Sequence, residues 1–269
     1  RGASHPIPMS RCALITGASG GIGYEVAKLF AREGDHVILV GRSEQKLGEV
    51  ARELQQSPGA STTVMAKDLA RPDASEELFA QLQRDGRTVD VLVNNAGFGT
   101  HGPFAESDLS VQREMMQLNM VALTHLTRLL LPGMIKQRAG KILNVASTAA
   151  FQPGPLMAVY YASKAYVLSF SEALANELRG TGVTVTALCP GPTRTNFQRR
   201  AGVGDTLLAR SGAAGAASVA QAGYRGLMAG KTVVIPGMRN RLLVFAVKYL
   251  PRPLVIQAVR KIQEKRQPR

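Results

Sequence analysis

The sequence predicts an α/β protein whose central parallel sheet carries helices on both faces. Three observations lead to this prediction. Short β-rich segments alternate with longer helical patterns along most of the chain. Several β-rich segments are continuous apolar runs, as strands buried on both faces require. Apolar residues make up 45% of the 269 residues and charged residues only 19%, which favours a large core and excludes a disordered chain.

The predicted strands are short, apolar and rich in aliphatic residues. In chain order they are Cys12–Thr16, His36–Val40, Thr62–Ala66, Asp90–Val93, Lys141–Val145, Val183–Cys189 and Thr232–Ile235. Helical patterns separate them, at about Ile22–Arg32, Glu44–Gln55, Ala74–Arg84, Leu109–Lys136, Val159–Arg179 and Ser218–Ala229. Strand–helix–strand units have right-handed crossovers, so this alternation predicts a parallel sheet.

One domain is expected to span residues 9–237, because nothing in that stretch reads as a linker. Residues 1–8 precede Met9 and are expected to be a leftover of recombinant expression. Residues 196–215 are rich in Gly, Ala and Arg and are expected to be the most mobile segment. Residues 238–269 form a basic amphipathic C-terminal extension.

The few cysteines and histidines argue against disulfide and zinc chemistry. Cys12 and Cys189 lie far apart, and the four histidines are scattered. We therefore expect a reducing compartment and a cytoplasmic location. The sequence shows neither an apolar run of about 18 uncharged residues nor a signal peptide.

Positive charge is concentrated in the last third of the chain. The net charge is +14, and residues 180–269 hold 15 basic side chains against two acidic ones. Nucleic acid, an anionic membrane or an acidic protein could be attracted to such a segment. Nucleic acid is the weakest of the three, because no nucleic-acid-binding motif is present.

The first motif is a glycine-rich turn, Thr16-Gly17-Ala18-Ser19-Gly20-Gly21-Ile22-Gly23, between the first strand and the first helix. Glycines in this position let backbone N–H groups approach a pyrophosphate at the helix N-terminus. The second strand is followed by Gly41-Arg42-Ser43 and lacks the acidic residue that accepts from a ribose 2′-hydroxyl. A guanidinium there can bind a 2′-phosphate through bidentate hydrogen bonds, which favours NADP(H) over NAD(H).

Polar residues follow the third, fourth and fifth strands. Asp68 and Asn94–Gly97 would lie at the carboxyl edge of the sheet, where such folds bind ligands, although each also suits a turn. Ser147 ends the fifth strand. Lys164 can share a helical face with either Tyr160 or Tyr161, so one phenol could be a proton donor beside an ammonium. Two half-buried tyrosines and a surface lysine are the alternative interpretation.

Together these motifs resemble the short-chain dehydrogenase/reductase family over about residues 11–237. The glycine loop, Asp68, Asn94–Gly97, Asn119, Ser147, Tyr160-x-x-x-Lys164 and Pro190-Gly191 match its motifs in order. The family's serine lies thirteen residues before its tyrosine, which selects Tyr160 over Tyr161. Arg42 resembles the NADP-preferring branch, and residues 189–197 resemble a broad subgroup that names no substrate. The resemblance implies a doubly wound, Rossmann-like sheet of seven parallel strands in the order 3-2-1-4-5-6-7.

The resemblance also implies catalytic roles. Tyr160 would donate a proton to a carbonyl oxygen, and Ser147 would orient that carbonyl. Lys164 would hold the nicotinamide ribose and lower the pKa of Tyr160. Asn119 would bend its helix and anchor a water for proton relay. The implied cofactor-binding residues are Gly17, Ser19, Gly21, Ile22, Gly23, Arg42, Asp68, Leu69, Asn95, Ala96, Gly97, Tyr160, Lys164, Pro190, Gly191, Thr193 and Thr195, with no metal.

The expected function is therefore an NADP(H)-dependent oxidoreductase acting on a carbonyl or secondary alcohol, in a homodimer or homotetramer as the family implies. The alternative is a non-catalytic dinucleotide-binding sensor or scaffold. Residues expected to line the substrate pocket are Phe98, Thr100, His101, Phe151–Met157 and those from Phe197 onward, and they favour a hydrophobic substrate. His101 is expected to be an ordinary loop residue and not a second catalytic acid.

The C-terminal extension is expected to form two short helices separated by Pro251 and Pro253. Its apolar faces are expected to pack on the body or on a second subunit, as a lid over the substrate cleft. A peripheral contact with an anionic membrane surface is the less favoured alternative, and an acidic carrier protein is weaker still.

Overall fold

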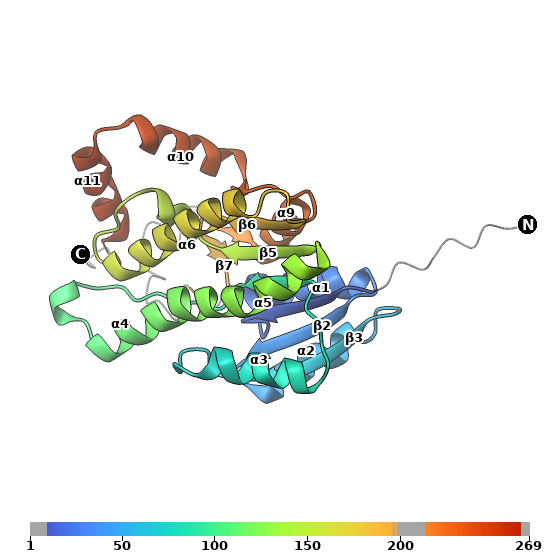
Figure 1. Ribbon diagram of the computed structural model, residues 1–269. Helices are drawn as coiled ribbons and strands as arrows, with labels where there is room; N and C mark the ends of the chain where they lie inside the picture. Colours follow the sequence, from blue (N-terminus) through green and yellow to red (C-terminus); the bar gives the residue numbers. More distant parts are fainter. Residues whose placement is uncertain (1–9, 196, 198–212, 265–269) are drawn as a thin grey trace, which may run out of the picture.

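The computed structural model describes residues 10–195, 197 and 213–264. Within these residues a seven-stranded parallel sheet forms the centre, in the order β3-β2-β1-β4-β5-β6-β9 (Figure 1). This is the predicted order, with β9 as the seventh strand. Residues 1–8, most of the segment 196–215 and residues 265–269 lie outside the described part of the chain, and so do the predictions made for them.

The strands of the large sheet are β1 (Cys12–Thr16), β2 (His36–Gly41), β3 (Ser61–Ala66), β4 (Val91–Asn94), β5 (Gly140–Val145), β6 (Val183–Leu188) and β9 (Val233–Val234). The main helices are α1 (Gly21–Arg32), α2 (Glu44–Leu54), α3 (Ala74–Arg84), α4 (Leu109–Met116), α5 (Leu123–Gln137), α6 (Ala158–Glu177), α9 (Ala216–Met228), α10 (Met238–Tyr249) and α11 (Arg252–Gln263). Short 3-10 turns occur at Phe104–Glu106 and Thr148–Phe151. A small pair of strands, β7 (Thr193–Arg194) and β8 (Ala214–Gly215), was not predicted.

Alternate residues of each central strand enter two separate cores. In β1, Ile15 packs with α1, α2 and α9, whereas its neighbour Leu14 packs with α3, α5 and α6 on the other face. Both side chains are fully buried. Because both faces are covered, the strands read as unbroken apolar runs in the sequence.

The predicted long helix Leu109–Lys136 is interrupted in the structure. Residues Gln117–Ala122 form a π-helical turn between α4 and α5, and Asn119 lies within it. This agrees with the expectation that Asn119 bends its helix. The whole stretch Leu109–Gln137 is the one described helix long and apolar enough to span a membrane by length and composition. Its Leu126, Leu130 and Met134 are buried against the sheet, as in a core helix.

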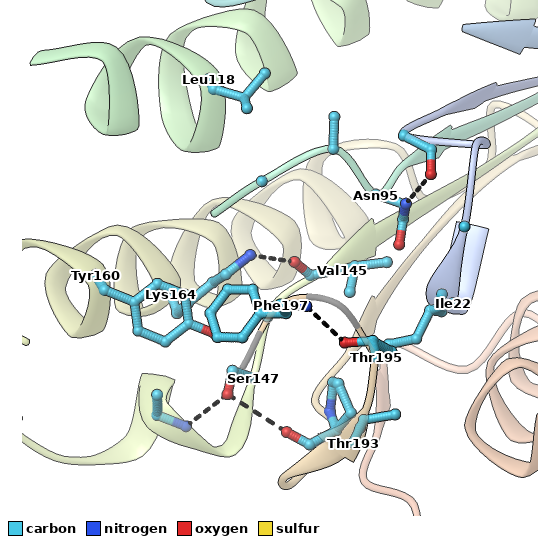
Figure 2. Close-up of a pocket in the computed structure, with 18 of the residues that line it drawn as sticks. Ile22, Asn95, Leu118, Val145, Ser147, Tyr160, Lys164, Thr193, Thr195 and Phe197 are labelled. Atoms are coloured by element: carbon cyan, nitrogen blue, oxygen red, sulfur yellow. Dashed lines mark hydrogen bonds between the residues drawn. The ribbon is translucent and has the colours of Figure 1, made fainter. Parts of the chain in front are cut away.

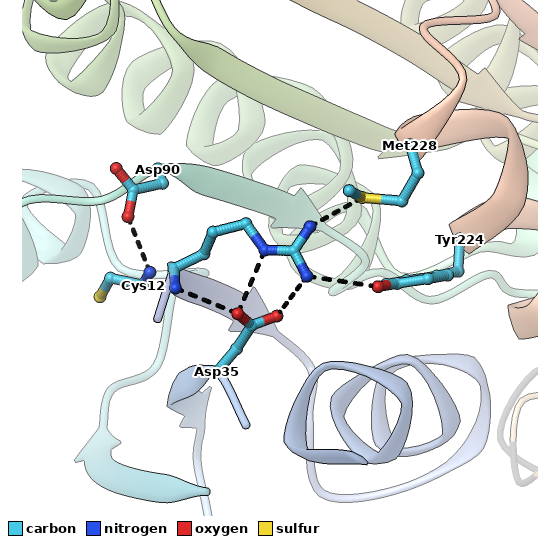
Figure 3. Close-up of polar contacts among 6 residues, drawn as sticks. Cys12, Asp35, Asp90, Tyr224 and Met228 are labelled. Carbon is cyan, nitrogen blue, oxygen red and sulfur yellow. Dashed lines mark hydrogen bonds and ion pairs between the residues drawn. The ribbon is translucent and has the colours of Figure 1, made fainter. Parts of the chain in front are cut away.

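A polar cluster fixes the edge of the sheet opposite the strands' carboxyl ends (Figure 3). Arg11 donates from Nε and Nη2 to the two carboxylate oxygens of Asp35, at 3.1 and 2.8 Å. The same guanidinium reaches Tyr224 and Met228 of α9. The cluster joins the start of β1, the α1–β2 turn and α9, and none of its residues lines the cleft described below, so its contribution is structural.

The C-terminal extension forms two helices, α10 and α11, which run past α6 at one end of the molecule (Figure 1). In α11, Val255, Val259 and Gln263 are buried, and the two valines pack on Ala149, Met157 and Tyr161. This half of the extension packs on the body, as expected. The other half, α10, touches the body only through partly buried residues such as Val247, and none of its residues is fully buried.

Candidate active site

The glycine-rich turn between β1 and α1 has a geometry that side chains would disrupt. Gly17 and Gly21 have left-handed φ values of +67° and +59°. A Cβ on Gly23 would lie 2.4 Å from Nδ2 of Asn95. That nitrogen donates to the carbonyl oxygens of Thr16 at 2.9 Å and Gly17 at 3.2 Å. The turn is thereby fixed to the end of β4, at the point where the strand order reverses.

The adenosine end of the predicted cofactor site is basic. Arg42, Ser43, Lys46 and Lys67 line the cleft, and no acidic residue occupies positions 41–43. The guanidinium of Arg42 is half exposed, and its nearest carboxylate, that of Glu114, is 4.0 Å away. Asp68 also lines the cleft. Its Oδ1 accepts from the backbone N–H of Ala70 at 3.1 Å, so it is a turn former and a lining residue at once.

Ser147, Tyr160 and Lys164 meet at the other end of the cleft, with Ile22 and Asn95 across from them (Figure 2). Lys164 is buried and its Nζ donates to the carbonyl oxygen of Val145 at 2.8 Å. Ser147 follows β5, and its Oγ accepts from the N–H of Ala149 at 3.1 Å. The strand end and the first turns of α6 therefore place a hydroxyl, a phenol and an ammonium together.

Burial controls the protonation of this cluster. It raises the pKa of Tyr160, and a hydrogen bond with Ser147 lowers that pKa by less. The net shift is opposite to the lowering of the Tyr160 pKa that was expected from Lys164, because the Nζ atom is 5.8 Å from the ring centre and burial dominates. Burial also lowers the pKa of Lys164 to about 8. A neutral phenol is the form that can donate a proton.

Tyr161 is engaged elsewhere. It is buried, and its hydroxyl accepts from Nε2 of Gln263 at 2.7 Å. Both tyrosines line the cleft, and it is Tyr160 whose ring centre lies 5.8 Å from Nζ of Lys164. The choice of Tyr160, which the family spacing implied, stays a prediction.

Asn119 lies behind the cleft rather than in its wall. Its Oδ1 accepts from the N–H of Phe98 at 3.1 Å, and its Nδ2 donates to the carbonyl of Phe98 at 2.9 Å and to Oγ of Ser163 at 3.1 Å. Oγ of Ser163 donates in turn to the carbonyl of Tyr160 at 2.7 Å. Asn119 thus connects the segment after β4 with the turn of α6 that holds Tyr160.

The structure brings most predicted site residues to one cleft of about 680 Å³. Those that line it are Gly17, Ser19, Gly21, Ile22, Arg42, Asp68, Leu69, Asn95, Ala96, Gly97, Ser147, Tyr160, Lys164, Pro190, Gly191, Thr193 and Thr195. Gly23 and Asn119 do not line it and act through the contacts given above. Among the described residues, no group of three or more His, Cys, Asp or Glu side chains could hold a metal ion.

The substrate side of the cleft is mostly apolar. Met157 and Phe197 line it beside Tyr160, and the rings of Phe197 and Tyr160 are 5.3 Å apart. Of the other predicted substrate residues, Gln152 lines the cleft, whereas Phe98, Thr100 and His101 are not among the lining residues. Nε2 of His101 instead bonds to the carbonyl of Gln263 at 2.7 Å. This contact holds α11 in place and leaves His101 a structural role.

Several lining residues were missed by sequence reasoning, among them Lys46, Lys67, Glu114 and Gln263. Lys46 carried a usable signal, since it follows Arg42 by four residues at the start of a helix. Gln263 carried none: it is 102 residues from its partner Tyr161. Its Oε1 is buried without a hydrogen-bond partner.

The residues present fit a nicotinamide dinucleotide. The glycine turn leaves no room for a Cβ at residues 17 and 23, and basic side chains gather at one end of the cleft. A doubly wound sheet with a dinucleotide cleft and a Ser–Tyr–Lys cluster defines a class of nicotinamide-dependent oxidoreductases. The chain belongs to the short-chain dehydrogenase family, whose model, described as short chain dehydrogenase, matches residues 11–204.

Relatives and solved structures agree with this assignment. The chain is 37% identical over 189 residues to a short chain dehydrogenase of Pseudocercospora fijiensis, covering 70% of this chain and 61% of that one. It is 39% identical over 183 residues to a very-long-chain 3-oxoacyl-CoA reductase of Phaeosphaeria nodorum, covering 66% and 53%. The match thus spans less than two thirds of both relatives.

Among solved structures, a short-chain dehydrogenase from Sphingobium yanoikuyae in complex with NADPH superimposes with a TM-score of 0.80 at 32% identity, covering 88% of this chain and 94% of that one. A bulky-bulky ketone specific alcohol dehydrogenase from Comamonas testosteroni gives 0.76 at 29% identity, covering 88% and 92%. These solved structures share the fold of this chain and the family to which it belongs.

Proposed function

We propose that this protein is an NADP(H)-dependent reductase of a bulky, hydrophobic ketone or aldehyde, or the dehydrogenase of the corresponding alcohol. The observation that carries the proposal is that Ser147, Tyr160 and Lys164 line one wall of the dinucleotide cleft together, with Nζ of Lys164 5.8 Å from the ring centre of Tyr160. A sensor that only binds the dinucleotide needs no such proton donor. No observation favours that alternative.

Ser147, Tyr160 and Lys164 have different roles in the proposed reaction. When bound, the nicotinamide supplies or accepts the hydride. Ser147 donates a hydrogen bond to the substrate carbonyl oxygen and fixes its position. The phenol of Tyr160 donates the proton that this oxygen needs as its negative charge develops. Lys164 would hold the ribose hydroxyls. Because burial raises the pKa of Tyr160, the phenol stays protonated at neutral pH, which favours carbonyl reduction.

The preference for NADP(H) is supported by Arg42 and Lys46 in the cleft and by the absence of an acidic residue at Gly41. A guanidinium attracts a 2′-phosphate, whereas a carboxylate at that place would repel it. The NADPH complex of the Sphingobium relative agrees with this preference. This similarity supports the preference for NADP(H) that Arg42 and Lys46 indicate.

The substrate class follows from the far end of the cleft. Met157, Phe197 and the buried face of α11 offer apolar contacts there. The relatives named for bulky ketones and long-chain oxoacyl thioesters have substrates of the same character. A bulky apolar ketone fits this wall better than a sugar does.

The test is NADPH oxidation with a panel of carbonyl compounds, followed by the loss of NADPH absorbance. The panel contains bulky aryl ketones, a 3-oxosteroid, a 3-oxoacyl thioester, a quinone and an open-chain sugar. Turnover of at least one apolar ketone, faster than of the sugar, is expected. NADPH binding without turnover of any compound would favour the sensor.

A further inference from the structure

Helix α10 turns its apolar stripe toward solvent. Met238, Leu242, Phe245 and Tyr249 recur at spacings of four, three and four residues and so share one face of the helix. Each side chain is 62–67% exposed. The rings of Phe245 and Tyr249 contact each other, with centres 4.8 Å apart. These four residues are referred to below as the α10 stripe.

The contacts of α10 with the body fix this orientation. Asn240, on the opposite face, bonds to the carbonyl of Pro236 at 2.7 Å and lies against Gly191 of the cleft. Val247 packs against the apolar cluster that contains Tyr161. A surface helix of a globular protein ordinarily buries its apolar face, whereas α10 turns its apolar face to solvent. Leu243, Leu250 and Leu254 are exposed as well.

Basic side chains border this apolar surface. Within the described residues 238–264 there are six basic residues and one acidic residue, Glu264, which pairs with Arg260 at 2.8 Å. Arg241 and Lys248 lie on α10 and are exposed, and Arg252 begins α11. An exposed apolar stripe with cationic flanks is typical of helices that lie in the interface of an anionic bilayer.

We propose that α10 is a docking surface for an anionic lipid membrane, with the α10 stripe entering the headgroup region and the cationic flanks binding lipid phosphates. A second copy of the chain is a poorer occupant, because a two-fold contact through this face would bring Arg241 and Lys248 of both copies together. The surface borders the cleft through Asn240 and Gly191. The enzyme would therefore meet apolar substrates where they dissolve.

The test is cosedimentation with vesicles of phosphatidylcholine alone or mixed with phosphatidylglycerol. The full chain should bind the mixed vesicles and should bind the neutral vesicles only weakly. Binding to the mixed vesicles should decrease at high salt. Lys248→Glu with Arg252→Glu should lower the partition coefficient about 30-fold or more, because each basic residue removed contributes roughly fivefold and the new carboxylates add repulsion. Leu242→Ser with Phe245→Ser should abolish binding at any salt concentration.

Two control variants match these changes in chemistry but lie away from α10. Arg84→Glu reverses an exposed charge, and Leu109→Ser removes an exposed apolar side chain. Both should bind as the unaltered protein does, and thermal unfolding should show that every variant is folded. Equal binding by the α10 variants, or none by the unaltered protein, would overturn the proposal. Light scattering that shows a dimer lost with Leu242→Ser and Phe245→Ser, without vesicle binding, would assign the stripe to a second copy. None of these readouts depends on the proposed activity.

Discussion

The choice between NADPH and NADH is predicted to rest on Arg42. Charge-assisted hydrogen bonds contribute about 1.5–3 kcal/mol. The Arg42 side chain is 53% exposed, so water screens part of this and about 1–2 kcal/mol remains. Arg42→Ala should therefore weaken NADPH binding roughly 5- to 30-fold. NADH, which has no 2′-phosphate, should bind as before.

A second variant tests the same argument from the opposite side. The structure has room for a side chain at Gly41, since a Cβ there would meet only Leu47, at an ordinary 3.5 Å. Gly41→Asp places a carboxylate beside the 2′-phosphate. At about 4 Å, two unit charges repel by about 1 kcal/mol in water and about 4 at the effective dielectric of a protein surface. The double variant with Arg42→Ala should prefer NADH.

The assay measures the Kd of each cofactor at one salt concentration. Each cofactor is titrated into the protein, and binding is followed by quenching of the protein fluorescence or by energy transfer to the nicotinamide. Arg52→Ala is the matched control, because Arg52 is exposed on α2, the helix that follows Arg42, and does not line the cleft. The reasoning is refuted if the unaltered protein binds NADPH and NADH equally, or if Arg42→Ala weakens both to the same extent.

Three further predictions concern buried polar groups. Asn119→Ala leaves the N–H and C=O of Phe98 without partners and should lower the free energy of unfolding by roughly 2–4 kcal/mol in urea titrations; an unchanged midpoint would contradict this. The pKa of Lys164 is lowered to about 8, so between pH 8 and 9.5 the unfolded chain binds more protons at this lysine and stability should rise with pH. Lys164→Met should remove that rise, and an identical pH slope in both proteins would refute it. Gln263→Ala removes the donor to Tyr161 and should raise KM for the ketone severalfold with the NADPH Kd unchanged; a changed Kd would place Gln263 in the cofactor site instead.

The central sheet and the dinucleotide cleft could be predicted because their signals are local. Strands buried on both faces are continuous apolar runs, and the turn at Gly17–Gly23 requires glycine where the backbone is left-handed or where Asn95 leaves no room. The sheet order followed from the family resemblance. Strands β7 and β8 are two residues each, too short to give a periodic signal.

The environment of the site could not be predicted in the same way. The spacing of Tyr160 and Lys164 does not reveal that burial outweighs their mutual attraction, since burial depends on the whole fold. The contact between Tyr161 and Gln263 joins residues 102 apart. For α10, the sequence shows an apolar stripe, but only the contacts of Asn240 and Val247 decide that the stripe faces outward.

The central claim is that Tyr160 donates the proton, and paired tyrosine variants test it most directly. Tyr160→Phe removes only the hydroxyl, so it should abolish nearly all NADPH-dependent turnover of the best ketone while the NADPH Kd stays within a few-fold. Tyr161→Phe should keep substantial turnover, because the hydroxyl of Tyr161 is occupied by Gln263. The account is contradicted if Tyr161→Phe abolishes turnover and Tyr160→Phe does not.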